Sequence, residues 1–64
     1  MLWLSEILMQ QHDVDSFKSL EKVVAVRAQA GEVFFQMDIR PPFADTPLDW
    51  EVRLEAAFTG AKNR

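Results

Sequence analysis

The sequence predicts a small α+β domain whose elements run in the order helix, short second helix, strand, strand, helix, with the two strands paired as an antiparallel hairpin. Three observations predict this fold class. Apolar residues recur at helical spacing over 2–12, residues 32–40 alternate between apolar and polar, and residues 46–49 have the composition of a helix start. The chain has 64 residues, which is enough for a single domain spanning 1–64.

The segment 2–12 is predicted to be an amphipathic helix. At 100° per residue, one arc of that helix holds a cluster of large apolar side chains, namely Trp3, Leu4, Ile7 and Leu8. Leu2 and Met9 fall on the opposite side. This helix would therefore carry more apolar surface than one contact can cover.

Residues 13–16 read Asp-Val-Asp-Ser, a cluster of residue types that favour helix N-caps. The chain is expected to turn here and to begin a second helical stretch that runs to about Lys22. Phe17 and Leu20, three residues apart, would share the inward side of that stretch.

Residues 32–40 are the clearest strand in the sequence. Their apolar members alternate with polar residues and are Val33, Phe35, Met37 and Ile39. Residues 23–29 before them are rich in β-branched side chains, and Gly31 supplies a turn. Pairing Gln29 with Glu32 sets Val26 opposite Phe35, so that the apolar residues of both strands share one face. The alternative is one continuous helix from 15 to 30 that ends at Gly31.

The last element is predicted to be a helix. Pro41-Pro42 ends the preceding strand, Thr46 is placed to act as N-cap with Pro47 at the first helical position, and Gly60 is placed to end the helix. The inward side would carry Trp50, Leu54, Ala57 and Phe58. The alternative is a third strand over 48–55, where apolar and charged residues also alternate.

Composition excludes several classes of function. Seven Lys and Arg against ten Asp and Glu give a net charge of −3, which argues against nucleic acid as a partner. The lack of cysteine excludes disulfides and thiolate zinc sites, and two glycines cannot build a Gly-rich phosphate loop. We therefore expect no catalytic residue, no cofactor and no metal ion, and a protein that is not an enzyme.

The apolar N-terminal segment lacks the features of a targeting signal. No Lys or Arg precedes Lys18, whereas a secretory signal begins with a cationic region. The apolar run is also far shorter than the roughly 20 residues that a membrane span requires. We expect a cytoplasmic protein that does not contact a membrane.

His12, Asp13 and Asp15 are the only residues from which an acid–base or metal site could be built. A simpler interpretation is a surface histidine at a helix end, followed by aspartates that cap the next helix. We adopt that interpretation, because a catalytic site also needs a pocket and supporting residues.

The strongest functional signal is surplus apolar surface. The residues predicted to bind a partner are Leu2, Met9, Phe34, Phe43 and Trp50. Leu48, Val52 and Ala56 on the last helix also fall outside its inward side. The sequence thus predicts a small interaction module that docks on a larger protein as a regulator, inhibitor or accessory subunit.

Self-association is a second expectation. We expect a homodimer with the first helix and Phe34 or Phe43 at the contact, because a chain this small without disulfides or metal has little stability of its own. The alternatives in other functional classes are a non-catalytic subunit of a multi-chain enzyme and a dimeric DNA-binding regulator.

Overall fold

A computed structural model describes residues 1–10 and 13–62 of the chain. Their helices and strands follow the order β1 (Leu2–Trp3), α1 (Leu4–Gln10), α2 (Phe17–Gln29), β2 (Phe35–Gln36) and α3 (Trp50–Lys62). The expected α+β class is confirmed. The internal arrangement differs from the expected one, mainly because the chain from 23 to 29 is helical and because residues 2–3 are a strand.

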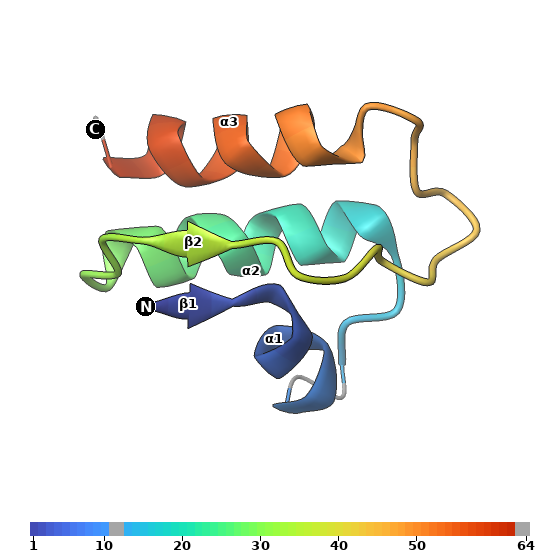
Figure 1. The fold of residues 1–64 in the computed structure, drawn as a ribbon, viewed down its shortest axis with the longest axis horizontal. Coiled ribbons are helices and arrows are strands. Elements are labelled where there is room, and N and C mark those ends of the chain that lie inside the picture. The colour runs from blue at the N-terminus through green and yellow to red at the C-terminus, as the bar shows by residue number, and fades with distance from the viewer. Residues whose placement is uncertain (11–12, 63–64) are drawn as a thin grey trace.

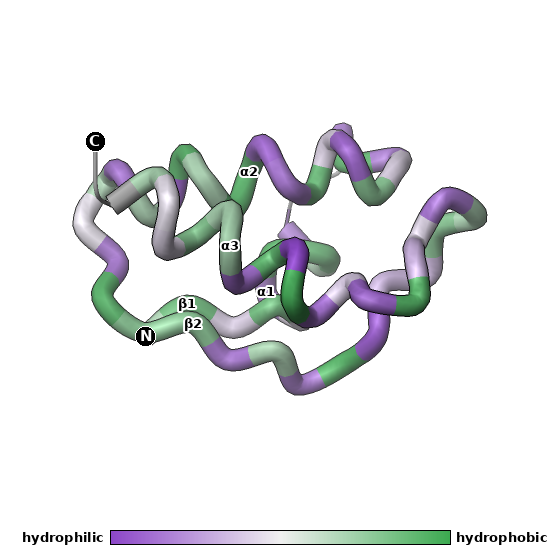
Figure 2. The backbone as a smooth tube through the Cα atoms, turned by 90° about the horizontal axis from the view of Figure 1, so that it is seen from above, coloured by the Kyte–Doolittle hydropathy of each residue, from purple (hydrophilic) through white to green (hydrophobic). Residues whose placement is uncertain are grey.

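The two strands are parallel neighbours joined by a helical crossover. Leu2 lies opposite Phe35 and Trp3 opposite Gln36. The chain leaves β1, passes through α1 and α2 behind the strands, and returns along β2, which makes a right-handed connection (Figure 1). Seen from above, the strands lie along one edge of the molecule, with α2 at the opposite edge and α3 between (Figure 2). Both long helices thus lie on one side of the strand pair.

The predicted antiparallel hairpin is wrong, and the alternative helix ending before Gly31 is the one that forms. Ser16 begins α2, since its hydroxyl accepts a hydrogen bond from the Ser19 N–H. The buried residues of α2 recur at helical spacing and are Phe17, Leu20, Val24 and Ala28. A stripe of this kind outweighs the strand preference of Val23–Val26, because strand propensity depends strongly on context. Gly31 follows with a φ of 115°, a conformation that favours glycine.

The first helix begins two residues later than expected, because Leu2 and Trp3 are extended and pair with β2. Alternation along this strand directs Leu2 into the core, where it is only 1% exposed, and turns Trp3 to the other side. The expectation that Leu2 faces away from the core while Trp3 faces it is therefore wrong.

The last helix is confirmed over the alternative strand, although it begins at Trp50 rather than beside Pro47. Thr46 instead closes a turn, its N–H donating to the Phe43 carbonyl at 3.1 Å. Asp49 precedes the first helical residue, and its carbonyl accepts from the Arg53 N–H. Its carboxylate also pairs with the Arg53 side chain at 2.9 Å. Gly60 lies inside α3 and does not end it.

The core lies between the strand pair and the long helices. Its buried apolar side chains come from every element except β2 and are Leu2, Leu4, Ile7, Phe17, Leu20, Val24, Ala28, Leu54, Phe58 and Ala61. Strand β2 contributes the half-buried Phe35, whose ring stacks on Phe58 with centroids 5.4 Å apart. This stack joins β2 to α3, while α2 and α3 pack directly against each other.

Two aspartates in the chain that follows β2 bind the starts of α1 and α2. The Asp38 carboxylate accepts from the Ser5 N–H at 3.1 Å. The Asp45 carboxylate accepts from the Phe17 N–H at 2.8 Å and the Lys18 N–H at 3.4 Å. Because the first N–H groups of a helix have no partner within it, these carboxylates supply partners from a distant part of the chain.

These hydrogen bonds lower the pKa of both aspartates. Hydrogen bonding by Ser5, its side chain first, lowers the pKa of Asp38 below its usual value. The N–H of Phe17 is the main cause of the lowered pKa of Asp45. Protonation removes the charge that these hydrogen bonds stabilise.

Stability should therefore fall in acid. A carboxyl whose pKa is lower in the folded state stabilises the fold above its unfolded pKa of about 3.9, and this contribution is lost as the pH falls through the folded pKa. Below about pH 4, we expect the melting temperature of the wild type to fall by more than that of the double variant Asp38→Asn/Asp45→Asn. Equal pH dependence of the two proteins between about pH 6 and pH 2, measured by circular dichroism, would contradict the capping role.

A pair of valines distinguishes α2 from a strand. Val24 is fully buried, whereas Val26 is 61% exposed. In the hairpin, both would have faced the core. Val24→Asp should unfold the protein, because an unpaired buried charge costs several kcal/mol. Val26→Asp should keep the wild-type helix signal and melting temperature in circular dichroism. Unfolding of the Val26→Asp variant would contradict the helix and favour the antiparallel hairpin.

Candidate interaction surface

The strand pair has one face that no helix covers. Side chains alternate along each strand, so Leu2 and Phe35 point toward the helices while Trp3 and Gln36 point away from them. The same alternation places Met1 beside Phe34, whose carbonyl accepts from the Leu2 N–H at 2.8 Å. We call Met1, Trp3, Phe34 and Gln36 the outer face.

The outer face is apolar at one end and polar at the other. Met1 and Phe34 are each 65% exposed, and Trp3 is 38% exposed. Gln36 and then Asp38 continue the same side of the chain toward α1. Figure 2 shows apolar (green) and polar (purple) residues alternating along the chain through β2 and beyond it. None of the four residues of the outer face has a charged side chain.

An uncovered face is unusual for parallel strands. Parallel sheets normally have both faces covered, because the helices that connect their strands pack on them. Here both long helices pack on the side of Leu2 and Phe35, and the other side keeps three large apolar side chains in water. A face of this kind is a candidate for contact with another molecule.

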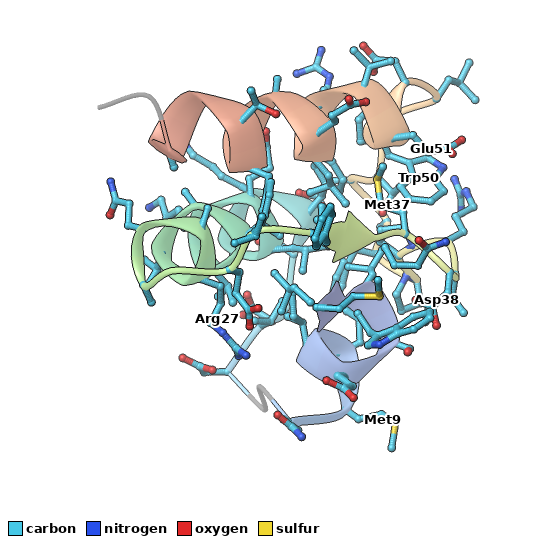
Figure 3. The ribbon with its side chains drawn as sticks, turned by 60° about the vertical axis from the view of Figure 1, so that its left-hand side comes forward. Met9, Arg27, Met37, Asp38, Trp50 and Glu51 are labelled. Carbon is cyan, nitrogen blue, oxygen red and sulfur yellow. The ribbon has the colours of Figure 1, made fainter. Side chains whose placement is uncertain are left out.

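The five predicted partner-binding residues divide into two groups. Leu2, Phe43 and Trp50 belong to the core or pack against it. Leu2 is fully buried, so it cannot take part in a surface contact. Phe34 lies on the outer face, whereas Met9 is exposed at the far end of α1 with its side chain pointing away from the other elements (Figure 3). The structure does not bring Met9 and Phe34 onto one surface.

Three residues of the outer face were not predicted to bind a partner, namely Met1, Trp3 and Gln36. The helical spacing of residues 3–8 assigned Trp3 to the core. Only the pairing of residues 2–3 with β2 reverses its side. A strand of two residues is too short to produce a detectable alternation in the sequence.

The acid–base candidate does not become a site among the described residues. His12 lies outside them. Asp15 accepts a hydrogen bond from the Ser19 hydroxyl at 3.4 Å, which supports its expected place beside the start of α2. Within residues 1–10 and 13–62, no three His, Asp or Glu side chains gather closely enough to hold a metal ion. None of the described helices is long and apolar enough to cross a bilayer.

Comparison with known proteins gives no relative. No protein-family model matches the chain, and no significant match was found among curated proteins or among solved structures.

The opposite surroundings of Leu2 and Phe34 predict opposite effects on stability. Leu2→Ala removes a fully buried side chain and should cost about 2–5 kcal/mol of unfolding free energy. Phe34→Ala removes an exposed ring and should change it by no more than about 0.5 kcal/mol. Urea unfolding measures both, and a larger loss for Phe34→Ala would mean that this ring is buried.

Proposed function

We propose that this protein is a small cytoplasmic interaction module that docks on a larger protein through its outer face. The observation that carries the proposal is the uncovered side of the parallel strands, with Trp3 and Phe34 exposed together on it. Aromatic residues combine a large apolar area with few rotatable bonds, and they are enriched at the centres of protein interfaces.

The charge distribution supports a protein partner. An interface centre is typically depleted of charge and surrounded by a polar rim. The outer face has this organisation, because the side chains at its apolar end are uncharged and its other end passes through Gln36 to Asp38. The Met1 ammonium at the apolar end is paired with the Glu32 carboxylate at 3.7 Å. A regulator, an inhibitor and an accessory subunit would all use such a surface in the same way.

Site-specific crosslinking tests this proposal. A photoreactive phenylalanine analogue at position 34 of the full chain, in host cells, should give one dominant crosslinked protein. The same analogue at Val52, an exposed position on α3, is the matched control and should not capture that protein.

The captured protein, once purified, allows the decisive measurement. Phe34→Glu should weaken its binding by about tenfold or more in calorimetry, because a charge is placed at the centre of the contact. Val52→Glu, which adds the same charge elsewhere, should bind as the wild type does. Equal affinity of the Phe34→Glu variant, or equal crosslinking from both positions, would contradict docking through the outer face.

A further inference from the structure

A second apolar surface lies on α2, on the side turned away from the core. A shallow hollow of about 190 Å³ opens there, lined by Lys22, Val23, Val26 and Arg27. Lys22 and Val26 belong to one row of side chains spaced four apart, and Val23 and Arg27 belong to the next row. A groove between two such rows is the surface into which a row of a second helix packs.

The charge of this groove restricts what can fill it. Two valines form its apolar part, with a cation at each end. Arg27 is already paired with Glu32 at 3.3 Å, whereas Lys18 and Lys22 project from the exposed side and make no ion pair within the described part of the chain. A helix that fits the groove should present an apolar row with carboxylates beside it.

The protein's own α3 presents such a row. Leu48, two residues before the helix begins, is 100% exposed, Val52 is 67% exposed, and Ala56 follows Val52 four residues on. Glu51 and Glu55 form the neighbouring row, and both are exposed. Asp49 and Arg53 form an ion pair on the other flank of the row, and their charges cancel. The net charge of this surface therefore comes from Glu51 and Glu55.

We infer that the α2 groove binds the Leu48–Val52–Ala56 row of a second copy of this chain, with Glu51 and Glu55 of that copy facing Lys18 and Lys22. The α3 row packs into the α2 groove as helices of globular proteins commonly do, and opposite charges set which surfaces meet. The groove and the row are different surfaces, so a pair of associated chains still has one free groove and one free row. Association is therefore head-to-tail and gives rings or open chains. It replaces the expected homodimer contact at Phe34 or Phe43 and is independent of the outer face.

Charge reversal tests this contact in sedimentation velocity at low salt. The wild type should sediment as species larger than 7.4 kDa as its concentration rises, and added salt should return it toward the monomer. Lys22→Glu and Glu55→Lys should each weaken self-association by about tenfold or more, because each places like charges together. Arg40→Glu has the same change of charge as Lys22→Glu at an exposed position outside α2 and α3, and should associate as the wild type does.

The two single variants also test each other. An equimolar mixture of Lys22→Glu and Glu55→Lys, or the double variant, should recover association, since opposite charges again face each other. Phe34→Glu should leave it unchanged, which separates this inference from docking through the outer face. The inference is overturned by a wild type that stays monomeric, by single variants that associate normally, or by a mixture and a double variant that both fail to recover.

Discussion

The hydrogen bond from the Leu2 N–H to the Phe34 carbonyl, 2.8 Å long, sets the side that each neighbouring residue faces. With this register, Leu2 fills the core next to Phe35, and Trp3 and Phe34 are left on the opposite side of the strands. The start of α1 follows from it, because the chain is extended until Trp3 and can coil only from Leu4. The core and the outer face are thus two consequences of one strand pairing.

Two residues per strand are too few to hold such a pairing by themselves. The structure supports it with contacts between distant parts of the chain. Phe35 stacks on Phe58 of α3, and Asp38 and Asp45 bind the starts of α1 and α2. The connection between β2 and α3 is therefore bonded to both α1 and α2, because its carboxylates accept hydrogen bonds from N–H groups at the starts of these helices. Asp38 and Asp45 are both exposed, so their contribution depends on charge and hydrogen-bond geometry rather than on burial.

Local signals predicted the elements that local physics controls. The α+β class and the helical state of α3 followed from spacing and composition, and the spacing of Phe17 and Leu20 gave their inward side. The hairpin failed because Val23–Val26 reads as a strand in isolation, while burial of Val24 and Ala28 against distant residues decides for a helix. The 32–40 alternation placed Phe34 on the polar side, and Phe34 is exposed, but it also placed Val33 and Ile39 on the apolar side, and they are 61% and 43% exposed. The exposure of Trp3 could not be predicted from its own segment. Its side depends on β2, a partner in a distant part of the sequence.

Nuclear Overhauser effects measure the parallel pairing of residues 2–3 with β2, on which the core and the outer face both depend. We predict short proton–proton distances between the backbones of Leu2 and Phe35 and of Trp3 and Gln36, together with slow exchange of the Leu2 amide proton. Cross-strand effects between Val26 and Phe35, with extended rather than helical backbone signals over 23–29, would contradict this pairing, because they would place the chain in an antiparallel hairpin with no β1.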